Sequence, residues 1–529
     1  MGSNGISRRA FIKTGATLAA GASAFPSPFL KTGGKASARP NILLLFADQH
    51  RGDVLGCAGD PLVRTPALDR LASEGTRFDR AYTPSPVCVP ARYALLTGRY
   101  PHRSGCTDNG DPMSPELPTI PGLLSDAGYQ TLGIGKMHFH PVRGPFGFQG
   151  LLLSEEIPAS PEQDEFLRDL IAAGFGHVHE PHGVRSELYY IPQVSQLPAH
   201  LHTTWWTADR TIEFLRERDR SRPFFVWTSF IKPHPPFDPP VPWNKLYRDF
   251  EMPLPARKPN SDLTTWHMRF QNHYKRRDAG TDENLVRALR AAYYASVSFV
   301  DYNIGRILEE LEKQGELERT LIVYAADHGE LLGDYGSWGK RCFYDPSARV
   351  PLIVRWPEQF PTGHVCHAPA SLVDLLPTFL SAAGLSQRHL AVDGEPLQRV
   401  ATGQTGRTWI LGQLARRRHG VYFLFDGRFK YIYSSPDQRE FLLDVEKDPF
   451  ETTNLASPLE NVTQRLRSQL VARFREDGYT EPLDKTGENW ALFEPPPEPA
   501  PPPSHFTQDA RWTDPYLHIP GYERDKSGG

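Results

Sequence analysis

The chain has 529 residues, too many for one ordinary hydrophobic core, so we expect one large domain with a smaller companion. Lysine and arginine number 59 against 62 aspartate and glutamate, a formal net charge of −3, and no basic excess points to nucleic acid as a partner. Hydrophobic residues make up 39% and aromatic residues 11%, as in ordinary globular enzymes.

The N-terminal segment, residues 1–38, has the pattern of a twin-arginine export signal. The pair Arg8-Arg9 precedes a mildly apolar run over residues 14–25, which is shorter than the about 20 apolar residues that a membrane span needs. Two small-residue cleavage motifs end at Ala24 and Ala38, and the second is preferred because a strand is predicted directly after it. We therefore expect a periplasmic or secreted protein without a membrane anchor, exported by the twin-arginine machinery.

A strand–helix alternation follows the signal up to about residue 385. Its first strand, over residues 41–47, is a continuous apolar run, as expected of a strand buried on both faces of a parallel sheet. The alternation predicts an α/β fold in which a large, mostly parallel central sheet is sandwiched by helices. Residues 39–385 are expected to form the catalytic domain, with the weakly periodic residues 150–200 as an insertion over the site. Further strands are predicted over 129–135, 223–230, 320–326 and 351–356, and helices over 65–72, 90–97, 120–127, 284–312 and 371–383.

The pattern changes after residue 385. Short alternating runs separated by turn residues predict antiparallel hairpins, and a helix follows them over residues 461–477. We therefore expect a smaller C-terminal domain with an antiparallel sheet plus a helix over residues 386–480. Residues 481–529 are expected to be a proline-rich extended tail. The predicted hairpin strands are 420–425, 428–433 and 440–443.

Polar or titratable side chains directly follow four of the predicted strands. In an open α/β sheet, ligands gather where strands end at their carboxyl edge, so these groups are expected to lie close together. Any single one of them is better explained as a helix cap or a loop residue, but that explanation weakens when four strands share the feature. The residues are Asp48, Gln49, Lys136, His138, His234, Asp327 and His328.

Two of these strand ends together offer ligands for one divalent metal. Asp48 and Asp327 supply carboxylates, Gln49 an amide oxygen, and His328 an imidazole nitrogen. Oxygen donors suit calcium or magnesium, whereas the imidazole nitrogen also suits manganese. We expect one divalent cation, with calcium as the first choice and manganese or magnesium as the alternatives.

A Cys-x-Pro-x-Arg motif runs from Cys88 to Arg92 and is followed by Leu-Thr-Gly-Arg-Tyr-Pro-His over residues 96–102. This pattern resembles the signature of type I sulfatases, members of the alkaline phosphatase superfamily. The resemblance implies that a formylglycine-generating enzyme oxidises Cys88 to formylglycine, whose hydrated aldehyde is the nucleophile. The family's usual serine at the fourth position of the motif is Ala91 here. The resemblance extends from residue 41 to about residue 455 and includes the segments 133–138, 232–237, 327–330, 338–340 and 448–455.

The resemblance also implies which groups assist the nucleophile. The converted residue 88 would be a further metal ligand, beside Asp327. Arg92 lies one helical turn from Cys88 on the same face, and its charge would stabilise the nucleophile and the sulfate oxygens. Lys136 and Lys340 would add positive charge around the transferring group.

On the leaving-group side, the resemblance implies two histidines. His234 would be the general acid for the leaving alcohol. His138 would assist removal of a proton from the second hydroxyl of the converted Cys88, which expels sulfate and regenerates the aldehyde. His182 and Arg185, in the predicted insertion, are candidates to line the leaving-group pocket.

Two positions depart from the family's usual metal shell. The family often has two adjacent aspartates after the first strand and Asp-Asn after the later one, where this chain has Asp48-Gln49 and Asp327-His328. Related phosphonate monoester hydrolases and phosphodiesterases show glutamine and histidine at such positions. The expected function is hydrolysis of a sulfate monoester, first of all on a sulfated carbohydrate, with aryl sulfates and choline sulfate left open. The alternatives are a phosphonate monoester or phosphodiester hydrolase, and a silent binder of sulfated glycans in which Cys88 is unmodified.

The five cysteines include no Cys-x-x-Cys pair, so a zinc site has no support. If Cys88 is converted, four cysteines remain for up to two disulfides after export. The pairing among them stays open: Cys57, Cys106, Cys342 and Cys366.

Overall fold

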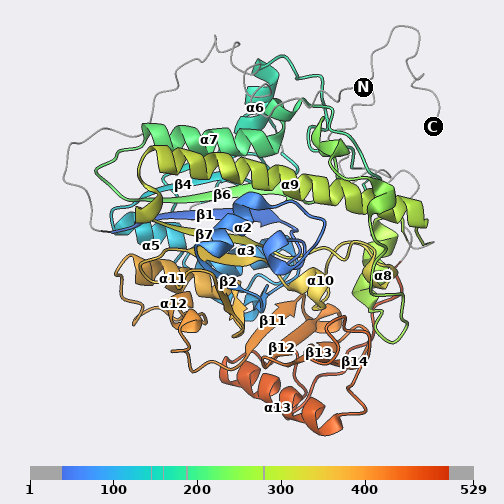
Figure 1. Ribbon diagram of the computed structural model, residues 1–529. Helices are drawn as coiled ribbons and strands as arrows, with labels where there is room; N and C mark the ends of the chain where they lie inside the picture. The colour runs from blue at the N-terminus through green and yellow to red at the C-terminus, as the bar shows by residue number, and fades with distance from the viewer. Residues whose placement is uncertain (1–38, 145, 159, 186–188, 278–279, 500–529) are drawn as a thin grey trace.

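An eight-stranded sheet in the order β5-β4-β6-β1-β7-β8-β2-β9 runs through the centre of the computed structural model (Figure 1). Its middle strand β1 (Asn41–Asp48) pairs in parallel with β6 (Phe224–Pro233) and β7 (Thr320–Ala326). β8 (Leu352–Arg355) runs antiparallel to both β7 and β2 (Thr76–Phe78), so the sheet is mostly but not wholly parallel. The remaining strands are β4 (Gln130–Gly135), β5 (Gly150–Leu153) and β9 (His364–Cys366).

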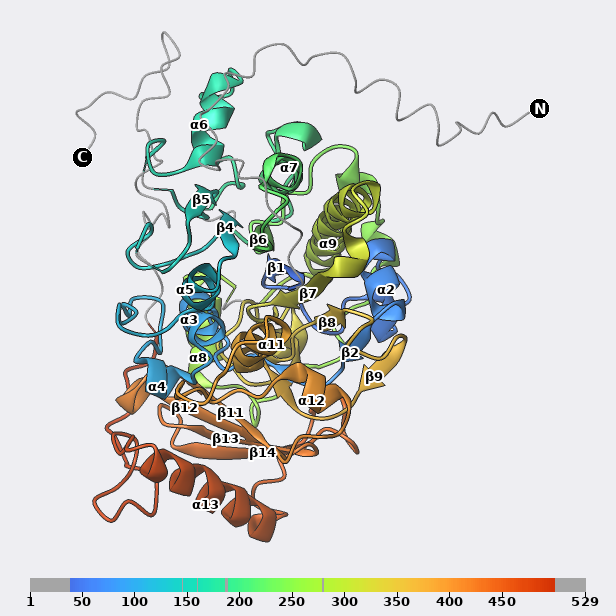
Figure 2. The ribbon, with the colours of Figure 1, turned by 90° about the vertical axis from the view of Figure 1, so that its left-hand side faces the viewer.

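Helices cover both faces of this sheet, as the second view shows (Figure 2). Successive side chains of a strand point to opposite faces. Leu43 and Leu45 therefore pack against helices on one face, whereas Leu44 and Phe46 pack against helices on the other. The first face carries α2 (Pro66–Ser73), α7 (Thr203–Glu217) and α9 (Glu283–Lys313); the second carries α3 (Cys88–Thr97), α5 (Ile120–Asp126) and α11 (Leu375–Ala382). The predicted α/β sandwich is confirmed.

The smaller C-terminal sheet is antiparallel, in the order β11-β12-β13-β14. The helix α13 (Glu460–Glu476), predicted over residues 461–477, packs against one of its faces (Figure 1). Its other face meets the large sheet's loops, where the rings of Phe343 and Phe423 stack with centroids 4.6 Å apart. The strands are β11 (Ile410–Leu414), β12 (Val421–Phe425), β13 (Phe429–Ser434) and β14 (Arg439–Asp444), of which β11 was not predicted.

The region predicted as an insertion contains the edge strand β5 and the helix α6 (Glu165–Ala172). A further helix, α8 (Trp266–Tyr274), lies between β6 and α9 in the chain and was not predicted. The shorter elements are α4 (Pro101–Ser104), α10 (Asp345–Ala348), α12 (Leu397–Ala401), β3 (Ala81–Tyr82) and β10 (Ala370–Ser371).

The structure describes residues 39–499 except 145, 159, 186–188 and 278–279. The predicted export signal and the last thirty residues of the predicted tail lie outside the described residues. Within the described ranges, no helix combines the length and apolar character that crossing a membrane requires. All five cysteines are in described segments, and none is paired in a disulfide.

Candidate active site

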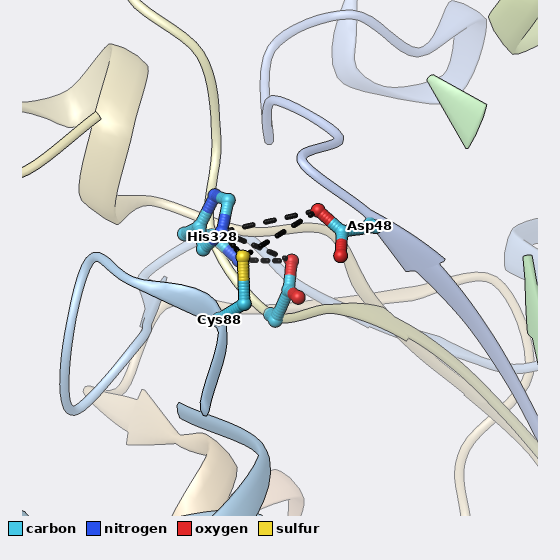
Figure 3. A group of neighbouring side chains, drawn as sticks. Asp48, Cys88 and His328 are labelled. Carbon is cyan, nitrogen blue, oxygen red and sulfur yellow. Dashed lines mark hydrogen bonds and ion pairs between the residues drawn. The ribbon is translucent and has the colours of Figure 1, made fainter. Parts of the chain in front are cut away.

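The carboxyl ends of β1 and β7, two neighbouring strands, bring together the predicted metal ligands. Asp48 is the last residue of β1, and Asp327 and His328 directly follow β7. Cys88 comes to the same place from the first turn of α3. One ligand atom from each of these four buried residues lies within 4.8 Å of the others, and Figure 3 shows three of the side chains around one point.

The start of α3 differs from the prediction and determines where Cys88 lies. The helix was predicted to begin at Pro90, but it begins at Cys88, after an extended Val87. Proline is tolerated in the first turn of a helix because the amide hydrogens there have no partner within the helix. Cys88 is therefore the first residue of the helix. Its Sγ lies 3.2 Å from His328 Nε2 and 3.1 Å from Lys340 Nζ.

Gln49 lies beside this cluster in a left-handed backbone conformation, with φ of 66°. Its backbone N–H donates to Asp327 Oδ1 at 3.0 Å, and its side-chain oxygen accepts from Lys340 Nζ at 2.8 Å. The Gln49 amide nitrogen donates to the carboxylate of Glu330, which also accepts from the Tyr190 hydroxyl. Left-handed conformations of non-glycine residues are uncommon and are often found at functional sites.

Arg92 is fully buried and joins the two carboxylates of the cluster. Its Nε donates to Asp327 at 3.0 Å, and one terminal nitrogen donates to Asp48 at 3.1 Å. The other terminal nitrogen donates to the Lys136 carbonyl and the Ser229 hydroxyl. The guanidinium is thus engaged on the protein side of the cluster, where it fixes the orientation of both carboxylates.

A chain of charged groups leads from Asp48 to His234. Lys136 Nζ lies 2.6 Å from Asp48 Oδ2 and also pairs with Glu156. The other carboxylate oxygen of Glu156 pairs with Arg185 and lies 3.4 Å from His234 Nε2. Sequence reasoning missed Glu156, although it closely follows β5 at the same sheet edge, because the short strand β5 was not predicted.

A cavity of about 530 Å³ opens onto this cluster. Of the predicted residues, Cys88, His138, His234 and Lys340 line the cavity, and so does Arg185 of the predicted insertion. The other predicted residues are buried and do not line it: Asp48, Gln49, Arg92, Lys136, His182, Asp327 and His328. The predicted site residues are therefore all in one region, but only some of them line the cavity.

The buried charges shift the pKa values of the two carboxylates, Asp48 and Asp327, in opposite directions. Burial raises the pKa of Asp48, but the positive charges of Lys136, His234 and Arg92 lower it by more than burial raises it. The pKa of Asp48 therefore lies well below its usual value. For Asp327, burial and the neighbouring Asp48 together raise the pKa. Two carboxylates that share a site cannot ionise equally without compensating charge. The site therefore favours a cation between them.

The surroundings of Cys88 are strongly electropositive. Burial and Asp48 raise the pKa of the Cys88 thiol, but Lys340, Lys136 and His328 lower it by a larger amount. The pKa of this thiol therefore lies well below its usual value. For His234, burial lowers the pKa well below its usual value, and Glu156 provides the largest opposing effect.

The donor set fits a divalent cation. Two carboxylates, one imidazole nitrogen and the side chain of residue 88 converge, and the amide oxygen of Gln49 is next to them. The carboxylate and amide oxygens suit calcium, magnesium or manganese, whereas the imidazole nitrogen is a softer ligand than calcium and magnesium usually take.

Comparison with known proteins agrees with this site. Residues 40–385 match the Sulfatase family, and residues 333–476 match the C-terminal region of N-sulphoglucosamine sulphohydrolase. The chain is 33% identical to an arylsulfatase of Clostridium perfringens, over 84% of this chain and 96% of that protein.

Two solved structures have the same fold over most of their length. A phosphonate monoester hydrolase of Agrobacterium radiobacter has a TM-score of 0.70 at 26% identity and covers 86% of this chain and 100% of that one. A structure in complex with its substrate D-glucosamine-2-N,6-O-disulfate has a TM-score of 0.68 at 25% identity and covers 85% of this chain and 99% of that one. The chain is therefore an enzyme of the sulfatase family, within the alkaline phosphatase superfamily.

Proposed function

We propose that this enzyme hydrolyses a sulfate monoester with a formylglycine hydrate at position 88 as the nucleophile and a divalent cation at Asp48, Gln49, Asp327 and His328. The observation that carries the proposal is the position of Cys88. It is the first residue of α3, it belongs to a Cys-x-Pro-x-Arg motif, and its side chain lies between His328 and Lys340 at the cavity wall.

The Sγ of Cys88 stands in for a hydroxyl oxygen of the converted residue. A group at this place is held at a helix N-terminus, where the helix dipole favours negative charge. Lys340 is within 3.1 Å of it and stabilises its deprotonated form. The sulfuryl group then forms an ester with that oxygen, and the alcohol leaves with a proton.

The cation, when bound, supplies Lewis-acid stabilisation of the negative charge on the nucleophile and the sulfate oxygens. The protein's own residues prepare its site. Arg92 orients the two carboxylates, and Lys136 balances the charge of Asp48. We propose calcium as the cation, with manganese or magnesium as the alternatives.

The proton for the leaving alcohol comes from His234. Its Nδ1 faces the Pro235 carbonyl at 2.6 Å and its Nε2 faces Glu156, so both ring nitrogens face acceptors, and Glu156 offsets part of the lowering of the His234 pKa by burial. His138 also lines the cavity, and its Nδ1 has no hydrogen-bond partner among the described residues. We assign it the removal of a proton from the second hydroxyl of residue 88, which releases sulfate and restores the aldehyde.

The test begins with the state of position 88 in protein from the native host. Conversion to formylglycine lowers the mass of the peptide that contains residue 88 by about 18 Da relative to cysteine, a loss that follows from the oxidation chemistry of the thiol. The converted protein is expected to hydrolyse 4-nitrophenyl sulfate. A peptide that carries only free thiol, with no turnover, would support a silent binder of sulfated glycans.

Gln49 and His328 favour one second candidate, a phosphonate monoester or phosphodiester hydrolase. The Agrobacterium radiobacter enzyme of that activity has the same fold. Sulfate monoesters and phosphate diesters each carry a single negative charge, so one positive site can accept both. Rates on 4-nitrophenyl sulfate and bis(4-nitrophenyl) phosphate separate the two functions, and a dominant diesterase rate would overturn the first.

We further propose a sulfated carbohydrate as the substrate, and export to the periplasm or beyond as the location. Support for the substrate comes from the size of the cavity and from the related structure in complex with a disulfated glucosamine. Support for export comes from the twin-arginine pattern of residues 1–38. Fractionation of the native host, with N-terminal sequencing of the mature chain, tests the location.

A further inference from the structure

Two buried lysines of the cavity are exceptional in their charge environment. Five lysines are buried in the part of the chain that the structure describes. Three of them form ion pairs with carboxylates: Lys136, Lys232 and Lys430. The other two, Lys275 and Lys340, make no ion pair with any described carboxylate, and both line the cavity. A buried ammonium is costly unless an opposite charge compensates it.

Lys340 is explained by the reaction, since it contacts Cys88 and Gln49. Lys275 is not. It follows the last residue of α8, and its ammonium lies 3.6 Å from the ring centroid of Tyr189 and 4.4 Å from that of Tyr274. Its Nζ donates no hydrogen bond to a described residue. Aromatic faces attract a cation but supply no counter-charge.

The surroundings of Lys275 add positive charge instead of cancelling it. The guanidinium of Arg185 lies 4.8 Å from the centroid of the same Tyr189 ring. Burial lowers the pKa of Lys275 well below its usual value, Arg185 and Lys340 lower it further, and Glu156 and Glu330 oppose this lowering only in part. Two buried carboxylates line the cavity, and both are engaged: Glu156 pairs with Lys136 and Arg185, and Glu155 accepts from the backbone N–H groups of Met137 and His138. Lys275 therefore lacks a counter-charge from the described residues. A bound anion could supply this counter-charge, in addition to the negative charge that the reacting sulfate brings to Cys88.

We propose that Lys275 binds a second anionic group of the substrate, a sulfate or a carboxylate on the released alcohol. The substrate class is then a sugar that carries at least two negative charges. This inference rests on the proposed function and adds a specificity-determining residue to it. The cavity of about 530 Å³ falls within the range of about 300–1,000 Å³ of small-molecule sites and has room for a sugar. Phe270 and Tyr274 of α8 line it next to Lys275 and add apolar surface for the sugar ring.

The test compares matched substrates on the converted full-length enzyme. One pair is N-acetylglucosamine 6-sulfate and glucosamine-2-N,6-O-disulfate, which adds a sulfate. The other pair is glucose 2-sulfate and glucuronic acid 2-sulfate, which adds a carboxylate. The wild type is expected to prefer the doubly charged member of at least one pair by roughly 10- to 100-fold in kcat/KM, as one charge-assisted hydrogen bond allows. The pair that shows the preference identifies the second anion.

The Lys275→Met variant is expected to lose that preference, mainly through a higher KM, and to retain its rate on 4-nitrophenyl sulfate within about threefold. Lys275→Arg keeps the charge and is expected to retain most of the preference. The exposed Lys447→Met is the matched control and should change neither.

Two results would overturn the inference. The first is a wild type that does not prefer the doubly charged member of either pair. The second is a Lys275→Met variant that loses as much on 4-nitrophenyl sulfate as on the doubly charged sugar, since Lys275 would then serve the reacting sulfate or the fold. Neither result affects the proposed sulfatase activity, which hydrolysis of 4-nitrophenyl sulfate by the wild type tests separately.

Discussion

Glu156 is expected to control catalysis through His234, and Glu156→Gln tests this. The carboxylate is 3.4 Å from His234 Nε2, and Coulomb's law with an effective dielectric constant of about 20 gives about 5 kcal/mol for the pair. Desolvation and the sharing of Glu156 with Lys136 and Arg185 reduce the net effect. Since about 1.4 kcal/mol corresponds to a factor of ten, we expect roughly a 10- to 100-fold loss of protonated His234 at neutral pH.

The assay uses two leaving groups. A sugar sulfate, whose alkoxide is a poor leaving group, needs the proton from His234, so kcat should fall by roughly 10- to 100-fold. With 4-nitrophenyl sulfate, whose leaving group needs no proton, the loss should stay within about threefold. Because the variant lowers the pKa of His234, the limb of the sugar sulfate pH profile that reports this group should move to lower pH.

Controls separate this effect from damage to the fold. Glu156→Asp keeps the charge and should retain part of the sugar sulfate rate, and His234→Ala should show the same dependence on the leaving group. Removal of one partner from a buried charge cluster also destabilises the protein, by about 3–5 kcal/mol, so unfolding in urea is measured beside the rates. Equal losses on both substrates, with an unmoved pH profile, would refute the proposed link between Glu156 and His234.

Three further predictions concern the nucleophile, the cation and one buried carboxylate. Cys88→Ala should lower kcat by roughly 1,000-fold or more with an unchanged circular dichroism spectrum, and substantial remaining turnover would contradict the assigned nucleophile. A cation at 100 times its dissociation constant should raise the free energy of unfolding by about 2.7 kcal/mol, and Asp327→Asn should reduce that gain; an equal gain in both proteins would place the cation elsewhere. Burial raises the pKa of Asp301 to about 7, so the folded chain binds a proton more tightly than the unfolded chain does, and stability from this group falls as pH rises from about 4 to 7. Urea unfolding of Asp301→Asn, whose amide oxygen keeps one of the two hydrogen bonds from the Ala67 and Leu68 N–H groups at the start of α2, should show a weaker decline over that range. An unchanged decline would contradict the raised pKa.

The sequence predicts the centre of the fold well, because local pattern and tertiary environment agree there. The strands β1 and β7 are continuous apolar runs, fully buried between two helical layers. The edge strand β5 is four residues long and largely half-buried, so it has neither a long apolar run nor an alternating pattern. The reversed direction of β8 also has no local signal, since strand direction depends on the path of the chain.

The candidate site shows the same division. Residues at the ends of long buried strands could be predicted, because strand ends meet at one edge of the sheet. The roles of Glu156 and Lys275 could not, because each depends on neighbours from distant segments. Glu156 acquires its three basic neighbours, and Lys275 its aromatic surroundings, only in the folded chain.

The C-terminal sheet supports the segments that carry two residues of the site. Gln413 N–H in β11 donates to the Pro84 carbonyl at 2.9 Å, four residues before Cys88, and Phe343, three residues after Lys340, stacks on Phe423 of β12. At the neighbouring Gly412, an added methyl group would come within 2.9 Å of the Pro84 oxygen and 2.7 Å of the Phe343 ring. The C-terminal sheet thus positions the segments that carry Cys88 and Lys340, although none of its four strands lines the cavity. Substitutions in that sheet would therefore impair turnover from a distance, because they would change the distance between residue 88 and Lys340.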